Sequence, residues 1–186
     1  MHYIDTLILG ILQGLTEFLP ISSSGHLVLG QYFLNIYMPG NAFEVVLHIG
    51  TLMSVITVFR IEIKSIIGDL SNPSNKFYLY ALVCGTIPAV IVGIVLKDMI
   101  SLIFDDIRFV SLSLIMTGII LISSRFIIIR NLKLTLLVAF IIGLAQAGAI
   151  IPGISRSGMT ICMGLLMGLS APDAAKFSFL LSIPVI

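Results

Sequence analysis

The polar residues of this chain gather in two short stretches, and their types are those that bind phosphate. The first stretch, residues 13–26, contains Glu17, His26, a proline, a glycine and three consecutive serines. The second stretch, residues 146–160, contains Arg156 between two serines. An arginine fork binds phosphate through two parallel hydrogen bonds, and serine hydroxyls and helix-start N–H groups add donors. Brought together, the two stretches would hold a phosphate or a diphosphate.

Phosphoryl transfer at such a site needs positioning, charge neutralisation, a nucleophile or activated water, and a base. A serine with His26 nearby, or His26 itself, would meet the last two needs. Glu17 would orient His26, act as the base or hold a divalent cation. Each group also has a structural interpretation. Serines in membrane helices bond to backbone carbonyls, and Glu17 with Arg156 would form an ion pair without a function.

Two further positions are accessory candidates for the same site. Glu44 lies one helical turn before His48, so the pair would face the same cavity or lie near the membrane interface. Gln13 is uncharged and would cap or cross-link helices, or join the site. We therefore name Gln13 and Glu44 as accessory candidates.

The composition identifies an integral membrane protein. Of the 186 residues, 58% are hydrophobic and 10% are charged, whereas a soluble domain is about half apolar and about a quarter charged. The net charge is +1 and no basic run with interleaved aromatics occurs, which excludes a nucleic-acid surface. Cys84 and Cys162 lie in apolar runs and are interpreted as small buried hydrophobes rather than a disulfide or a metal pair.

Two segments, residues 4–36 and 134–169, are predicted as re-entrant helix hairpins. Each contains two apolar runs that flank a polar break, and each run is too short for a bilayer, which needs about 20 residues. Pro20 and Gly25 are predicted to bracket the first break, because proline removes a backbone donor and glycine permits a positive φ. A broken helix leaves orphan N–H groups at membrane depth, and these groups bind anions well.

Longer apolar segments are predicted to cross the membrane: residues 43–59, 77–96 and 109–124. Loop 60–76, between the first two spans, and loop 125–133, after the third, each carry more Lys and Arg than acids, whereas loop 97–108 is acidic. The positive-inside rule places the two basic loops in the cytoplasm.

The two hairpins also resemble each other in sequence, which indicates an internal repeat. Residues 21–25 align with residues 154–158, and the same offset relates Gln13 to Gln146. An odd number of crossings between the hairpins inverts the second copy relative to the first. We therefore predict one all-α membrane domain, residues 1–186, with inverted-topology repeats over about residues 1–60 and 134–186. The alternative is a chance match between apolar sequences that contain Gly and Ser.

Both stretches resemble the signatures of one family, the bacterial undecaprenyl-diphosphate phosphatases or bacitracin-resistance proteins. The first signature is similar to Gln13-x-x-x-Glu17 followed by Pro20 and Ser22-Ser23-Ser24-Gly25-His26. The second is similar to Pro152-Gly153-Ile154-Ser155-Arg156-Ser157-Gly158-Met159-Thr160. The similarity runs along essentially the whole chain, with both motifs in order.

This resemblance implies an enzyme that hydrolyses undecaprenyl diphosphate to undecaprenyl phosphate and phosphate. Such an enzyme recycles the lipid carrier of peptidoglycan synthesis and confers resistance to bacitracin. The resemblance further implies a multi-pass protein of the bacterial cytoplasmic membrane, an active site facing the outer side, and a requirement for Mg²⁺ or Ca²⁺. The partners would be a polyprenyl diphosphate and membrane lipids, and a homodimer is left open.

The resemblance also implies roles for individual residues. Glu17 and His26 would be catalytic, Ser23 would be the nucleophile or a phosphate ligand, and Arg156 would bind the diphosphate. The remaining phosphate-site positions would be Ser22, Ser24, Gly25, Gly153, Ser155, Ser157 and Thr160. With glutamine at position 13, the cation would rest mainly on Glu17.

Members of the family extend beyond residue 186 with further membrane helices that close the second repeat. We therefore expect this chain to be C-terminally truncated relative to the family, and poorly folded or weakly active by itself. A transporter or lipid flippase is the alternative function, because inverted repeats with broken helices are also transporter architecture. A nucleophile–base pair favours the enzyme, since a carrier needs only the phosphate clamp. A purely structural protein would leave Glu17, His26 and Arg156 unexplained.

Overall fold

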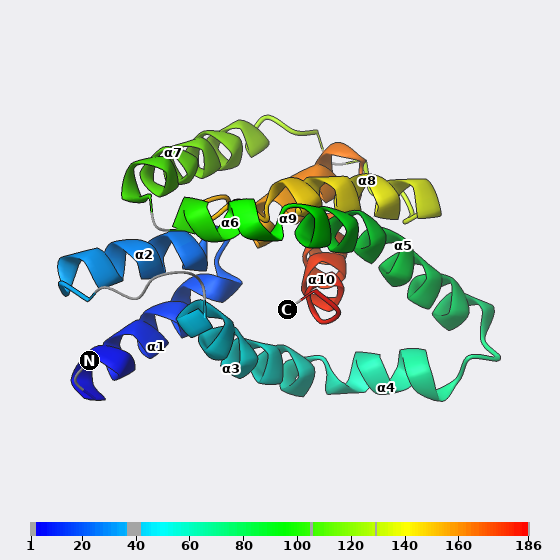
Figure 1. Ribbon diagram of the computed structural model, residues 1–186. Helices are drawn as coiled ribbons and strands as arrows, with labels where there is room; N and C mark the ends of the chain where they lie inside the picture. Colours follow the sequence, from blue (N-terminus) through cyan, green and yellow to red (C-terminus); the bar gives the residue numbers. More distant parts are fainter. Residues whose placement is uncertain (1–2, 37–41, 105, 129, 186) are drawn as a thin grey trace.

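The computed structural model describes residues 3–36, 42–104, 106–128 and 130–185, and all regular structure within these ranges is helical (Figure 1). The predicted all-α fold is therefore confirmed. The helices are α1 (Tyr3–Phe18), α2 (Ser23–Phe33), α3 (Ala42–Val58), α4 (Arg60–Gly68), α5 (Pro73–Val95), α6 (Lys97–Phe104), α7 (Ile107–Ser124), α8 (Leu136–Gly148), α9 (Arg156–Leu166) and α10 (Ala171–Ser182).

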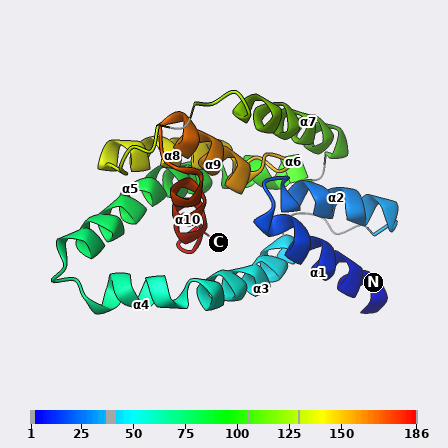
Figure 2. The ribbon, with the colours of Figure 1, turned by 180° about the vertical axis from the view of Figure 1, so that it is seen from behind.

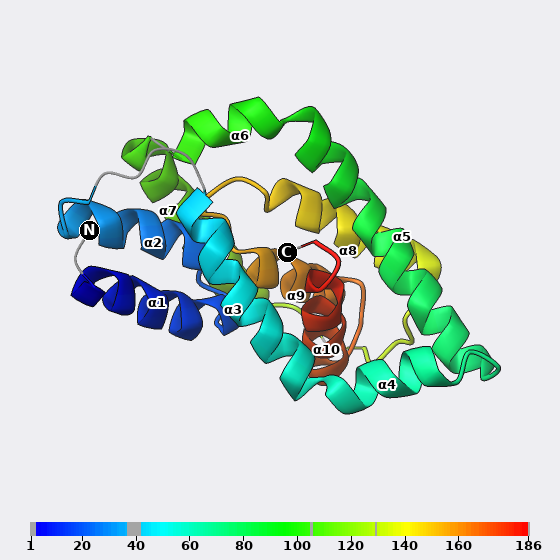
Figure 3. The same ribbon diagram turned by 60° about the horizontal axis from the view of Figure 1, so that its bottom comes forward.

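The first broken hairpin consists of α1 and α2, which lie side by side (Figures 1 and 3). The chain leaves the helical path between them where Pro20 cannot donate a backbone hydrogen bond. Ser22 has a positive φ of 69° and caps α2, because its side chain accepts from the backbone N–H of Gly25 at 3.4 Å. Gly30 lets the helices approach, since an added Cβ would lie 2.9 Å from the Leu9 side chain.

The second broken hairpin consists of α8 and α9, and its break is held by α7. Gly153 has a φ of 91°, and an added Cβ would lie 2.5 Å from the Val110 carbonyl, so the position requires glycine. The Thr117 hydroxyl donates to the Gly153 carbonyl at 2.8 Å and accepts from the Ser155 N–H at 3.0 Å. Ser155 then caps α9 by accepting from the Gly158 N–H at 3.0 Å.

Among the residues that the structure describes, two helices, α5 and α7, are long and apolar enough to cross a membrane, and α3 with α4 adds a third span if the bent pair counts as one. The angle between α3 and α4 is 70°. α5 begins at Pro73, earlier than predicted, because Asn72 caps it by accepting from the Ser74 N–H at 2.9 Å. These spans and the apolar composition describe a multi-pass membrane protein.

Two segments predicted as loops are largely helical. α4 lies in the predicted loop 60–76, and α6 lies in the predicted loop 97–108. Arg60, Glu62 and Lys64 alternate with isoleucines, which is not a helical period, but Ile63 and Ile66 are three positions apart and share one face of α4, and Ile66 is buried. Charge marked these segments as polar but did not exclude an amphipathic helix, so the loop predictions are wrong there.

The largest helix contact in the described residues joins α5 to α8. Gly143 on α8 faces the backbone of α5, and an added Cβ there would lie 2.2 Å from the Gly85 carbonyl oxygen. The neighbouring core is apolar and includes α10, which lies within the frame of α3, α4 and α5 (Figures 2 and 3). Its buried members are Ala81, Ala139, Ile142, Leu169, Ala174, Phe177 and Leu181.

The two hairpins meet at their breaks, which places their polar residues together. An added Cβ on Gly25 would lie 3.0 Å from the Gly153 Cα, and one on Gly158 would lie 3.1 Å from the Pro20 carbonyl oxygen. The Ser157 hydroxyl donates to the Leu19 carbonyl at 3.3 Å. These contacts join residues from opposite ends of the chain and define the position of the candidate site.

Candidate active site

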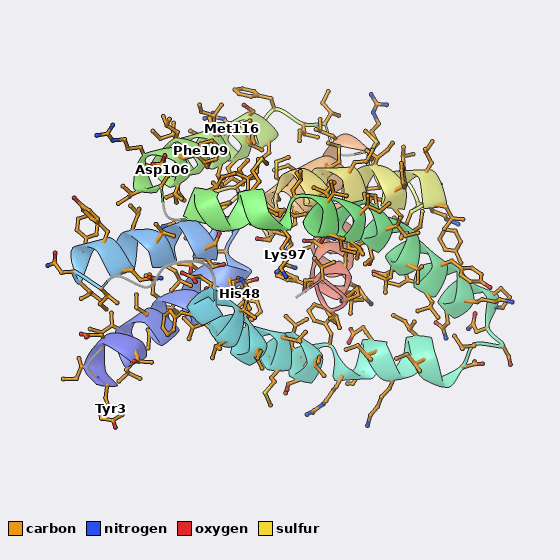
Figure 4. The ribbon with its side chains drawn as sticks, viewed as in Figure 1. Tyr3, His48, Lys97, Asp106, Phe109 and Met116 are labelled. Carbon is orange, nitrogen blue, oxygen red and sulfur yellow. The ribbon has the colours of Figure 1, made fainter. Side chains whose placement is uncertain are left out.

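A cavity of about 230 Å³ lies where the two breaks meet. Residues from α1, α2, α3, α8 and α9 line it, together with Val185 after α10. Figure 4 shows His48 on the part of α3 that passes the first hairpin. The polar lining residues are Glu17, Ser22, Ser23, Ser24, Glu44, His48, Gln146, Ser155, Arg156 and Ser157.

The Glu17 carboxylate is the centre of the polar contacts in this cavity. Its Oε1 accepts from Arg156 Nη2 at 2.5 Å, and its Oε2 accepts from Gln13 Nε2 at 3.0 Å and from the Ser23 hydroxyl. His48 Nε2 lies 3.3 Å from the same Oε2. Glu17 is only 7% exposed, so these partners supply the hydrogen bonds that water would otherwise provide.

His48 is the imidazole that contacts Glu17. Its Nδ1 lies 2.6 Å from the Glu44 backbone carbonyl, and its Nε2 faces the Glu17 carboxylate. Both neighbours are acceptors, and only the imidazolium form of histidine donates at both ring nitrogens. The sequence spacing of Glu44 and His48 predicted a shared cavity as one of two options. The packing of α3 against α1, which selects that option, depends on tertiary structure.

Arg156 carries a second set of donors that faces no acceptor. Its Nη2 binds Glu17, while its Nη1 is buried and has no hydrogen-bond partner among the described residues. Arg156 is also the first residue of α9, and Ser23 is the first residue of α2. Helix N-termini carry partial positive charge and unsatisfied N–H groups. The arrangement therefore suits an anion with several acceptor oxygens.

All four predicted phosphate-site serines line the cavity, and they form two pairs. The hydroxyls of Ser22 and Ser24 lie 3.3 Å apart, and those of Ser155 and Ser157 lie 3.3 Å apart. Each pair begins a helix of one hairpin. Two helix starts with hydroxyl groups thus face the same space, as the sequence predicted from the two stretches.

Four predicted site residues do not line this cavity, and their roles stay predictions. His26 Nδ1 lies 2.7 Å from the Ser22 carbonyl, within its own helix turn. Gly25 and Gly153 pack against each other where the breaks meet. Thr160 lies behind Arg156, where its hydroxyl donates to the Arg156 carbonyl at 2.9 Å and lies 2.6 Å from the Ser178 hydroxyl.

The two accessory candidates take different positions. Gln13 is 1% exposed and is not among the lining residues, but its amide nitrogen holds Glu17. Glu44 lines the cavity, and its Oε1 accepts from Gln31 Nε2 at 2.6 Å, which ties α3 to α2. Gln146 lines the cavity as well and was not predicted as a site residue.

The donor set does not fit a divalent cation held by the protein alone. Across the described residues, no three or more His, Cys, Asp or Glu side chains form a group that could hold a metal ion. Both oxygens of Glu17 already face cationic or N–H donors, and Arg156 at 2.5 Å would repel a cation there. The Mg²⁺ or Ca²⁺ implied by the resemblance stays a prediction, and Glu17 would have to give up one of these contacts to bind it.

A second cavity of about 400 Å³ lies beside the first, and its lining is almost entirely apolar. It is formed by residues of α4, α5 and the end of α10. Ile183 and Pro184 line this apolar cavity, while the next residue, Val185, lines the polar one. Consecutive residues after α10 thus line the apolar and the polar cavity.

Comparison with known proteins supplies the family context. The family model described as "Bacitracin resistance protein BacA" matches residues 6–186. "Undecaprenyl-diphosphatase 1" of Pseudoalteromonas translucida (strain TAC 125) is 41% identical, with 100% of this chain and 74% of that protein covered. "Undecaprenyl-diphosphatase" of Rubrobacter xylanophilus is 40% identical, with 100% and 74% covered. "Undecaprenyl-diphosphatase 2" of Bacillus thuringiensis (strain Al Hakam) is 42% identical, with 99% and 72% covered.

Proposed function

Because the chain belongs to the bacitracin resistance protein BacA family, we propose that it hydrolyses undecaprenyl diphosphate to undecaprenyl phosphate and phosphate. One observation carries the chemistry. Arg156 of the second hairpin meets Glu17 and Ser23 of the first hairpin in one cavity. A guanidinium that can bind phosphate thus lies beside a carboxylate that accepts a hydrogen bond from a serine hydroxyl. Nucleophilic catalysis needs such a pair of hydroxyl nucleophile and neighbouring base.

In the proposed first step, the Ser23 hydroxyl oxygen attacks the terminal phosphorus. Glu17 accepts the hydroxyl proton through the hydrogen bond that already joins the two side chains. A bond forms between Ser23 Oγ and phosphorus, and the bond from this phosphorus to the bridging oxygen breaks. Undecaprenyl phosphate leaves with the bridging oxygen.

In the second step, water attacks the phosphorus of the phosphorylated Ser23. A bond forms between the water oxygen and phosphorus, while the bond to Ser23 Oγ breaks. The proton carried by Glu17 returns to Ser23 Oγ. Glu17 then holds a proton taken from the attacking water, and the phosphate product carries this proton away when it leaves. Atoms and protons therefore balance over the cycle, and the net reaction is hydrolysis.

Positive groups on the protein neutralise the charge that develops on the phosphoryl oxygens. Arg156 Nη1 has no protein acceptor among the described residues and is positioned for a phosphate oxygen. The imidazolium form of His48 adds a second positive charge on the far side of Glu17. Electrostatic stabilisation of this kind is the main contribution of proteins to phosphoryl transfer. The catalytic role of His26 remains a proposal from the family resemblance.

The apolar cavity beside the polar one suits the isoprenoid part of the substrate. A lipid diphosphate is polar at one end and apolar along its chain, and the two cavities offer the same sequence of environments. Burying the chain removes apolar surface from water, which is favourable by about 25 cal/mol per Å². We propose that the protein lies in the bacterial cytoplasmic membrane with its site facing the outer side.

The test is phosphate release from a polyprenyl diphosphate in detergent micelles, with and without EDTA. Micelles have no second compartment, so release supports hydrolysis, whereas lipid binding without release supports a transporter. Arg156→Ala should slow release about 10³-fold, and release at the unmodified rate by that variant would contradict the proposal. The predicted loss from truncation is tested in parallel with a form extended by the C-terminal quarter of an aligned relative. Variants are compared in the more active form.

A further inference from the structure

Gln146 is a buried amide that finds no hydrogen-bond partner in the part of the chain that the structure describes. It lies in the last turn of α8, is 1% exposed and lines the polar cavity. Neither its Nε2 nor its Oε1 makes a hydrogen bond to any described residue. Leaving such a group buried costs free energy comparable to a lost hydrogen bond. An unpaired amide in the wall of a cavity therefore indicates that its hydrogen-bond partner is a ligand or water molecule in that cavity.

Arg156 Nη1 shares this property in the same cavity. It too is buried and without a protein acceptor, although Nη2 of the same side chain binds Glu17. Two N–H donors from the two helices of the second hairpin therefore lack acceptors. A phosphoryl group supplies several acceptor oxygens at once, and the Gln146 Nε2 is suited to one of them.

The repeat-related residue shows what a structural glutamine looks like at this position. Gln13 is also 1% exposed, but its Nε2 donates to Glu17 at 3.0 Å and it does not line the cavity. The first repeat thus uses its glutamine to hold the carboxylate. The second repeat leaves both polar atoms of Gln146 at the cavity wall with no such task.

We propose that Gln146 contacts the substrate and the water of the hydrolytic step, an inference that rests on the proposed function. Its Nε2 donates to an oxygen of the terminal phosphoryl group beside Arg156. Its Oε1 accepts a hydrogen from the water that attacks the phosphorylated serine, because a phosphoryl group without protons offers this oxygen no donor. An uncharged amide meets both needs, whereas a carboxylate would repel the diphosphate.

The test compares Gln146→Met and Gln146→Glu with the unmodified protein in the detergent assay. Methionine keeps the length of the side chain and removes both hydrogen-bonding groups. We expect Gln146→Met to lower kcat/KM at least about tenfold with an unfolding midpoint equal to or above that of the unmodified protein. Gln146→Glu should lose more activity because it adds a negative charge. Inorganic pyrophosphate should raise the unfolding midpoint of the unmodified protein more than that of Gln146→Met.

Gln31→Met is the matched control for stability. Gln31 is 7% exposed and donates to Glu44 Oε1 at 2.6 Å, so the same substitution there breaks a made hydrogen bond and should lower the midpoint. The proposal is wrong if Gln146→Met keeps the unmodified kcat/KM. It is also wrong if Gln146→Met lowers the unfolding midpoint as much as Gln31→Met does and lowers kcat/KM only by the fraction of protein that is unfolded. Failure of the unmodified protein to release phosphate would contradict the proposed function instead, and the pyrophosphate shifts would still decide the contact.

Discussion

Arg156 Nη2 lies 2.5 Å from Glu17 Oε1, although 139 positions separate the two residues in the sequence. Glu17 belongs to the first hairpin and Arg156 to the second, so the pair forms only when both breaks are docked. Removing one partner of a buried ion pair leaves an uncompensated charge, which costs about 3–5 kcal/mol. The docking of the two hairpins and the charge balance of the site therefore depend on the same ion pair.

Substitution of Arg156 should reduce both activity and stability, because it removes a phosphate-binding group and leaves Glu17 without its ion-pair partner. Arginine groups that bind transferring phosphoryl groups raise kcat by about 10³–10⁵. We expect the loss of kcat in Arg156→Ala to lie near the lower end of this range. Arg156→Lys keeps the charge but loses the planar fork, so it should recover only part of the rate. The measurement is kcat/KM for phosphate release, with the unfolding midpoint recorded for each variant.

Lys176→Ala is the matched control for this loss of a cation. Lys176 lies 3.8 Å from Glu62, and both side chains are substantially exposed. Exposed pairs contribute about 0–1 kcal/mol, so the control should leave activity and midpoint nearly unchanged. Equal effects of the two substitutions would show that Arg156 acts only through net charge.

Ser23→Ala should remove both the fast reaction and a covalent intermediate. The proposed mechanism passes the terminal phosphoryl group to Ser23 Oγ, so brief reaction with substrate labelled at the terminal phosphorus should label the protein. We expect the label to disappear in Ser23→Ala and kcat to fall by at least about 10³. Ser54→Ala serves as the control, because Ser54 is exposed and its hydroxyl donates to the Gly50 carbonyl at 3.1 Å. A labelled Ser23→Ala protein would rule out this nucleophile.

His48→Ala should lower kcat because it removes the donor that faces Glu17 Oε2 at 3.3 Å. Positioned acid–base groups raise the rate by about 10²–10⁴. Since His48 acts on the Glu17 carboxylate and not on the substrate, its removal should lower kcat by about 10² or less. His48→Gln retains an N–H donor and should recover part of the rate. His26→Ala, measured beside them, tests the role that the family resemblance assigns to His26. Full activity in His48→Ala would show that this contact has no part in catalysis.

The two hairpins were predictable because their breaks carry local chemical signals. Pro20 and Gly153 lie in the two breaks, as properties of single residues predict. Gly25 was predicted to bracket the first break but lies inside α2, and the positive φ that ends this break belongs to Ser22 instead. Glu17 and Arg156 were identifiable because ionised side chains are rare in apolar sequence. Their meeting was inferred from the repeat, and the 2.5 Å contact follows from how the two breaks dock.

The missed residues depend on contacts that no local pattern reports. His48 lies on an apolar helix whose rotation is set by packing against α1 and α10. Gln146 differs from Gln13 only in its surroundings, because the same residue type at the same repeat position meets Glu17 in one case and the cavity wall in the other. The repeat does carry one signal for Gln146, because Ile150 stands four residues after it, where Glu17 stands four residues after Gln13.

Gly143→Ala should destabilise the fold through the contact between α5 and α8. An added Cβ would lie 2.2 Å from the Gly85 carbonyl oxygen, and backbone must shift to admit it. Overpacking of this kind costs about 1–3 kcal/mol or more. Gly118→Ala is the matched control, because a Cβ there meets nothing within 4 Å and alanine gains about 1 kcal/mol of helix propensity. Thermal unfolding in detergent should show a lower midpoint only for Gly143→Ala, and equal midpoints would contradict the close packing.

A divalent cation should bind this protein only together with a diphosphate. Protein-bound Mg²⁺ commonly uses one or two carboxylates plus substrate phosphates, and Glu17 alone is already held by Arg156, Gln13 and Ser23. Titration of Mg²⁺ into the protein without substrate should therefore show no saturable binding at micromolar concentrations. EDTA should still slow hydrolysis if the cation arrives on the diphosphate. Micromolar binding to the protein alone that disappears in Glu17→Gln would contradict this, because it would mean that Glu17 exchanges its arginine for a metal ion.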